Sequence, residues 1–259
     1  MTLFYEQFGN PADPMFVFLH GGGVSGYMWE EQVKHFSKSF HCIVPDLPAQ
    51  GKSQSAEPFS IAGSAAVINR LIKQLAGGKT VIVTGFSLGA QVLVEMLAQE
   101  PNLIHYAIIN SALVKPMPSA KLWLKPMLAL SLPLTRSKFF AKLQAKELYI
   151  PSHQFELYYQ ESKHTQLNNL LSVMQENMSF SIPNGFEKST AKILVTVGML
   201  EKKMMRQSTE ALVKSGNDCT GIIFPNIGHG ISLANPQLFN STIDQWLDHK
   251  PLSPELLAI

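Results

Sequence analysis

The sequence is poor in cysteine and in charged residues, and both shortages exclude classes of protein. Two cysteines among 259 residues, Cys42 and Cys219, are too few for a disulfide scaffold and too far apart for a Cys-x-x-Cys metal site. Charged residues make up only 15% of the chain, and the formal net charge is +2. Because nucleic-acid binding needs a strongly basic surface, we expect no nucleic-acid partner.

Long hydrophobic runs are also missing. The most apolar stretch, residues 122–134, contains Lys125, Pro126 and Pro133 and is too short to span a bilayer. The first residues, M-T-L-F-Y-E-Q-F-G, lack the basic segment, apolar core and cleavage site of a signal peptide. We therefore expect a cytoplasmic globular protein with no membrane span and with reduced, ordinary thiols.

Short apolar runs rich in β-branched and aromatic residues are typical of buried strands. Such runs occur at residues 15–19, 41–44, 80–84, 104–109, 193–197 and 221–224. Segments with helical spacing lie between or after them, including residues 61–76, 88–99 and 236–248. Buried strands that alternate with crossover helices indicate an α/β fold, a mostly parallel central sheet flanked by helices.

The alternation stops once, in the middle of the chain. Residues 113–188 contain no convincing strand and hold helix-like segments such as L-W-L-K-P-M-L-A-L and F-E-L-Y-Y-Q-E. The strand pattern then resumes at Ala191. We predict a core domain of residues 1–112 and 189–259, with residues 113–188 inserted between two strands as a helical lid.

The pentapeptide G-F-S-L-G, centred on Ser87, lies between a predicted strand and a predicted helix. A nucleophile held on a sharp strand-to-helix turn needs small neighbours, because a Cβ at Gly85 or Gly89 would clash with the closely approaching backbone. The N-terminus of the following helix would favour developing negative charge. The alternative is an ordinary glycine-rich loop with an N-capping serine.

A second glycine-rich segment, H-G-G-G at residues 20–23, follows the strand at residues 15–19. Glycines there would let backbone N–H groups approach a bound oxygen, as an oxyanion hole requires. Open α/β sheets bind ligands at the carboxyl ends of their strands, which is where this loop and Ser87 are both expected. A flexible loop without function is the other interpretation.

A serine hydroxyl needs a base to become a nucleophile, and His229 is the best candidate. It follows the last predicted strand and stands between glycines in F-P-N-I-G-H-G-I-S. Glu201, just past the strand at residues 193–197, is the best carboxylate to orient it, since the end of the strand at residues 104–109 offers no acid. Alternatively, His229 is a structural loop residue and Glu201 a solvated residue that opens a basic helix.

Together these segments resemble the α/β-hydrolase fold superfamily, specifically its lidded serine hydrolases with an H-G-G-G loop. The resemblance implies Ser87 as nucleophile, His229 as general base and then acid, and Glu201 as the orienting acid. It also implies an oxyanion hole made by the backbone N–H groups of Leu88 and of Gly22 or Gly23. The segment D-L-P-A-Q-G-K-S at residues 46–53 departs from the family pattern D-L-P-G-H-G-x-S at two positions of a structural loop.

A hydrolase of this kind takes a small-molecule substrate and needs neither a metal nor an organic cofactor. We expect it to cleave carboxylic esters of moderately sized apolar substrates, with lid side chains lining the substrate pocket. Our candidates for that lining are Trp123, Met127, Phe139 and Tyr158. The fold also supports lactonases, thioesterases, amidases, carbon–carbon bond hydrolases, cofactor-free haloperoxidases and low-turnover ligand sensors, and the sequence leaves these alternatives and the oligomeric state open.

Overall fold

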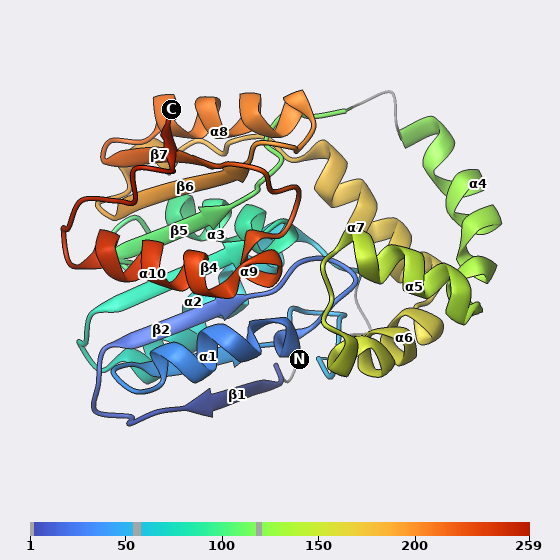
Figure 1. Ribbon diagram of the computed structural model, residues 1–259, viewed down its shortest axis with the longest axis horizontal. Coiled ribbons are helices and arrows are strands. Elements are labelled where there is room, and N and C mark those ends of the chain that lie inside the picture. The colour runs from blue at the N-terminus through green and yellow to red at the C-terminus, as the bar shows by residue number, and fades with distance from the viewer. Residues whose placement is uncertain (1–2, 54–57, 118–120) are drawn as a thin grey trace.

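The computed structural model describes residues 3–53, 58–117 and 121–259. Its centre is an eight-stranded sheet with the strand order β1-β3-β2-β4-β5-β6-β7-β8 (Figure 1). The edge strands β1 and β8 run antiparallel to their neighbours, and the strands between them pair in parallel. The strands are β1 (Tyr5–Phe8), β2 (Met15–Leu19), β3 (His41–Pro45), β4 (Val81–Phe86), β5 (Tyr106–Asn110), β6 (Lys192–Gly198), β7 (Cys219–Phe224) and β8 (Leu257–Ala258).

Helices cover both faces of this sheet, so its central strands are buried on both sides. Helices α2, α3 and α8 pack on one face, and α1 and α10 pack on the other (Figure 1). The helices of the core are η1 (Gly26–Trp29), α1 (Glu30–Phe36), α2 (Ile61–Ala76), α3 (Leu88–Gln99), η5 (Phe186–Lys188), α8 (Lys203–Ser215), α9 (Ile231–Ala234) and α10 (Pro236–Leu247). The predicted fold class is confirmed.

Helix α2 shows why the local sequence predicts some elements well. The Ser60 Oγ accepts a hydrogen bond from the Gly63 N–H at 3.1 Å, which satisfies a free donor of the first turn. At the other end Gly77 has φ 55°, the left-handed conformation that commonly ends a helix. In contrast, the sequence pattern does not indicate β1 and β8, because most of their side chains are exposed.

The helical insertion between β5 and β6 is also confirmed. It contains α4 (Lys121–Ser131), η3 (Leu132–Arg136), α5 (Lys138–Glu147), η4 (Ser152–Gln154), α6 (Phe155–His164) and α7 (Leu167–Ser179). These helices lie together at the right of Figure 1, beyond the carboxyl ends of the parallel strands. Within the described part of the chain, every helix is too short or too polar to cross a membrane.

Candidate active site

Ser87 occupies a strained turn between β4 and α3. Its backbone has φ 53° and ψ −110°, a conformation that residues with a Cβ rarely adopt. A Cβ at Gly85 would lie closer than 3.0 Å to the Gly89 carbonyl, and a Cβ at Gly89 would be equally close to the Leu19 carbonyl. The expectation that both flanking positions need glycine is therefore confirmed.

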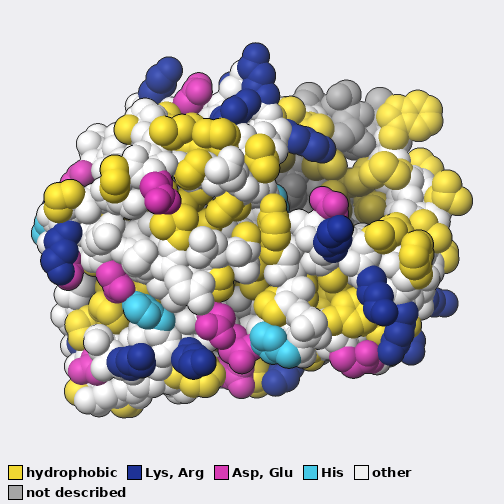
Figure 2. Space-filling model, viewed as in Figure 1, with side chains coloured by type: hydrophobic (Ala, Val, Ile, Leu, Met, Phe, Trp, Pro, Cys, Tyr) yellow, Lys and Arg dark blue, Asp and Glu magenta, His cyan; other side chains and the backbone are white. Residues whose placement is uncertain are grey.

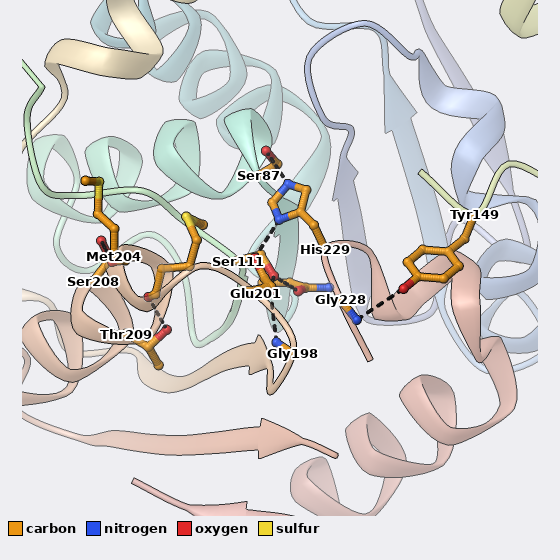
Figure 3. Close-up of polar contacts among 12 residues, drawn as sticks. Ser87, Ser111, Tyr149, Gly198, Glu201, Met204, Ser208, Thr209, Gly228 and His229 are labelled. Atoms are coloured by element: carbon orange, nitrogen blue, oxygen red, sulfur yellow. Dashed lines mark hydrogen bonds and ion pairs between the residues drawn. The ribbon is translucent and has the colours of Figure 1, made fainter. Parts of the chain in front are cut away.

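His229 lies in the loop after β7 and faces Ser87 (Figure 3). Its Nδ1 is 2.7 Å from Glu201 Oε2, and its Nε2 is 3.0 Å from Ser87 Oγ. Because a carboxylate only accepts hydrogen bonds, Nδ1 carries the proton and Nε2 is left to accept the hydroxyl proton of Ser87. The imidazole also packs against the Phe86 ring, with 4.8 Å between the ring centroids.

Glu201 follows β6 and is fixed by three hydrogen bonds. Besides the His229 imidazole, its carboxylate accepts bonds from Ser111 Oγ at 2.6 Å and from the Gly198 N–H at 2.8 Å (Figure 3). Its side chain is 1% exposed. Burial acts to raise the pKa of this carboxyl, but the hydrogen bonds and the neighbouring His229 outweigh it and hold the pKa below its ordinary value.

Ser111 is a member of this site that sequence reasoning missed. It follows β5, has φ 56°, and also lies 2.9 Å from the Asn110 side-chain oxygen. The end of β5 carries no carboxylate, and Ser111 instead supplies a hydroxyl donor to Glu201, which follows the neighbouring strand β6. The sequence therefore has a polar residue at the expected strand end, but this residue is a hydrogen-bond donor to the acid and not the acid itself.

The H-G-G-G loop lies against the start of α3. The buried His20 donates from Nδ1 to the Gly21 carbonyl at 2.7 Å and accepts from the Leu47 N–H at 2.8 Å, which anchors the loop. Burial lowers the pKa of His20, so the imidazole stays neutral in this arrangement. A Cβ at Gly22 would lie 3.5 Å from the Leu88 side chain, so the predicted oxyanion-hole residues of the two segments are neighbours.

Gly23, the other predicted loop residue, adopts φ 78°, and a Cβ placed there would meet no atom within 4 Å. The first N–H groups of α3, beginning with Leu88, have no partner within their own helix. A Cβ at Gly21 would lie 3.6 Å from the Ser87 Cβ, so the glycine loop passes beside Ser87.

The four predicted pocket-lining residues of the lid differ in their exposure, and their contact with substrate stays a prediction. Trp123, Met127 and Phe139 are 74%, 52% and 74% exposed, so most of each side chain faces solvent. Tyr158 is buried inside the lid, with its hydroxyl 3.4 Å from Gln144 Oε1. The sequence correctly marks these side chains as apolar, but hydrophobicity alone does not say which face of a lid helix is covered.

Two other lid residues reach the site. The Tyr149 hydroxyl accepts a hydrogen bond from the Gly228 N–H at 3.2 Å, beside His229 (Figure 3). Val173 on α7 would lie 3.6 Å from a Cβ at Gly22. Nothing in the local sequence distinguishes these two residues, because their positions depend on how the lid packs onto the core.

A serine on a strained strand-to-helix turn, hydrogen-bonded through histidine to a buried carboxylate, defines the arrangement of the α/β hydrolases. The chain belongs to the alpha/beta hydrolase fold family, whose model matches residues 14–190.

Two curated relatives and one solved structure are similar to this chain. An "AB hydrolase superfamily protein" of Gibberella zeae is 28% identical over 42% of this chain and 39% of its own length, so the alignment covers less than half of either protein. The "(E)-2-((N-methylformamido)methylene)succinate hydrolase" of Acinetobacter baylyi is 21% identical over 96% of this chain and 94% of that protein. A thermophilic esterase from Thermogutta terrifontis superposes with a TM-score of 0.79 at 18% identity, over 95% of this chain and 93% of that one, and it shows the shared fold.

Proposed function

We propose that this protein is a serine hydrolase that cleaves carboxylic esters of moderately sized apolar substrates through an acyl-enzyme on Ser87. The observation that carries the proposal is the unbroken set of hydrogen bonds from Ser87 Oγ through His229 to Glu201. These hydrogen bonds support the proposal, because nucleophilic catalysis by serine requires a base within reach of the nucleophile and a fixed carboxylate within reach of the base.

In the first half of the reaction, Ser87 Oγ attacks the ester carbonyl carbon while its proton moves to His229 Nε2. The carbonyl oxygen becomes an oxyanion, which we assign to the backbone N–H of Leu88 and to that of Gly22, with Gly23 as the alternative donor. Collapse of the tetrahedral intermediate breaks the carbon–oxygen bond, and the proton on His229 passes to the departing alcohol.

In the second half, His229 takes a proton from water and the resulting hydroxide attacks the acyl carbon. The second tetrahedral intermediate releases the carboxylic acid and returns the proton to Ser87. Glu201 holds the imidazole in the productive tautomer and offsets its positive charge in both halves. The low pKa of the Glu201 carboxyl supports this role, because the group stays ionised when His229 is protonated.

The preference for apolar substrates is supported by the side chains around Ser87. Phe86 contacts the His229 ring, and Leu88 and Val173 lie beside the Gly22 position of the loop. Such walls favour an apolar acyl or alcohol group over a charged one. Lactones and thioesters require the same nucleophile and oxyanion hole, so the leaving group has to be distinguished by assay.

A fluorophosphonate probe tests the nucleophile. We expect stoichiometric labelling of the wild-type protein, no labelling of Ser87→Ala, and normal labelling of Ser64→Ala, which removes a different serine hydroxyl from helix α2. Labelling of Ser87→Ala at the wild-type rate would show that another residue is the nucleophile.

A panel of esters, lactones and thioesters, assayed on the purified protein, tests the substrate class. Steady turnover of short p-nitrophenyl esters supports the esterase. Faster turnover of the lactones or thioesters would make that class, and not the esters, the proposed substrates. Covalent retention of the acyl group without turnover would favour a ligand sensor.

A further inference from the structure

The outer side of the lid exposes large apolar side chains. Trp123, Met127 and Leu130 follow one another on α4 at intervals of four and three residues, so they lie on one face of the helix. Leu130 is 82% exposed. The neighbouring face of α4 already buries Leu124 and Leu128, and the helix packs on α7. Helix α4 therefore has a second apolar face that none of the residues described by the structure covers.

The exposure continues into η3 and α5, where Leu134, Phe139 and Leu143 also face water. On α5 the residues Phe139, Lys142, Leu143 and Lys146 have the spacing of one helical face, so the apolar side chains there alternate with cations. Figure 2 shows hydrophobic side chains gathered at this end of the molecule, with Lys and Arg beside them. We define the lid patch as Trp123, Met127, Leu130, Leu134, Phe139 and Leu143 together with Lys142 and Lys146.

Charge is distributed unevenly around the lid patch. Residues 101–146 contain seven Lys and Arg and no Asp or Glu, so all 19 acidic residues lie elsewhere and outnumber the remaining basic ones. Lys138 is paired with Glu156 at 3.0 Å. In the part of the chain that the structure describes, no ion pair joins Lys142 or Lys146 to a carboxylate. Residues 101–146, which include the lid patch, are therefore cationic, and the residues outside this range are net acidic.

We propose that the lid patch docks on the surface of an anionic lipid bilayer. The exposed aromatic and aliphatic side chains would enter the boundary between headgroups and acyl chains, and the two lysines would bind anionic headgroups. Neither contribution alone anchors a protein stably, and the lid patch combines both. A second copy of the chain fits this face less well, because a twofold axis would bring the cations of the two patches together.

Docking in this way would also orient the rest of the protein. Helix α5 is followed directly by Leu148 and Tyr149, and the Tyr149 hydroxyl bonds to Gly228 beside His229. The lid patch and the His229 loop are thus linked by one short segment, and the residues outside 101–146, which are net acidic, are repelled from the same membrane. This docking does not depend on the ester hydrolase proposed above.

Co-sedimentation with lipid vesicles tests the proposal. We expect the protein to sediment with vesicles of equal parts phosphatidylcholine and phosphatidylglycerol, weakly with phosphatidylcholine alone, and less at high salt. Lys142→Gln/Lys146→Gln should weaken partitioning by roughly 25-fold, since each lysine near an anionic surface contributes roughly a factor of five. Leu130→Ser/Phe139→Ser should weaken it by about tenfold or more.

Matched controls change the same kinds of side chain away from the lid. Lys34→Gln/Lys38→Gln removes two exposed cations near α1, and Leu257→Ser removes an exposed leucine of β8. Both should leave partitioning unchanged. Circular dichroism of every variant verifies that it is folded.

Tryptophan fluorescence reports insertion directly. Trp29 is buried and Trp246 is partly buried, so Trp123 is the exposed tryptophan of the three. We expect its emission to shift to shorter wavelength on the mixed vesicles and the shift to vanish in Trp123→Phe. The proposal is overturned if the wild-type protein does not sediment with the mixed vesicles. It is also overturned if the control variants lose as much vesicle binding as the lid-patch variants. A solution dimer that Leu130→Ser/Phe139→Ser dissociates would instead assign the lid patch to a second copy.

Discussion

Removing the Cβ at position 87 should stabilise this protein while abolishing its activity. Ser87 adopts φ 53° and ψ −110°, and a residue with a Cβ in such a conformation costs about 1–3 kcal/mol. Glycine avoids that cost but loses about 0.5–1 kcal/mol through its greater freedom in the unfolded chain. Ser87→Ala keeps the Cβ and loses the same hydroxyl, so it is the matched reference.

The difference between these terms predicts that Ser87→Gly is more stable than Ser87→Ala by about 1 kcal/mol. For a domain of this size, that difference raises the melting temperature by about 2–4 °C. Urea unfolding at neutral pH and calorimetry measure it, and both variants should be inactive toward esters. A Ser87→Gly protein that is no more stable than Ser87→Ala would refute the reasoning that the turn stores strain.

Three further variants test residues of the same site. Glu201→Gln should lower turnover by about 10⁴-fold, as loss of the orienting carboxylate does in serine hydrolases. Since the folded pKa of Glu201 lies below its ordinary value of about 4.5, the carboxylate stabilises the fold fully above that pH and progressively less as pH falls through the lowered pKa. The free energy of unfolding should therefore fall less steeply with decreasing pH in Glu201→Gln than in the wild type. An unchanged slope would contradict the assignment. Ser111→Ala removes a 2.6 Å bond to the carboxylate and should lower kcat about tenfold with little change in KM, so a change in KM alone would argue against a positioning role. Gly89→Ala should destabilise the fold by about 3 kcal/mol in urea unfolding, because its Cβ would overlap the Leu19 carbonyl; wild-type stability would show that the backbone can move apart.

The sequence predicts the central part of the fold because burial there follows the chain locally. Strand β4 is buried throughout and α3 begins directly after Ser87, so the apolar run, the glycines and the helical spacing all mark the same turn. Strands β1 and β8 lack such marks, since an edge strand that is largely exposed needs no apolar alternation.

The residues of the candidate site also differ in how well the sequence predicts them. Ser87, Glu201 and His229 stand next to strand ends that the pattern of apolar runs locates, so their meeting could be expected from topology. Ser111 and Tyr149 act through single hydrogen bonds between distant segments, which no local pattern encodes. The lid was predicted as helical, but which of its apolar faces would be covered depends on how α4 packs against α7.

The pairing of β5 with β6 has an evolutionary consequence. Tyr106 lies opposite Lys192 and Asn110 opposite Thr196, so the two strands that bracket the lid are neighbours in parallel register. Any segment long enough to cross back from the end of β5 to the start of β6, about a dozen residues or more, is compatible with this strand pairing. A lineage could thus exchange the whole segment by recombination, and with it the surface and substrate range, while inheriting the hydrolytic machinery unchanged.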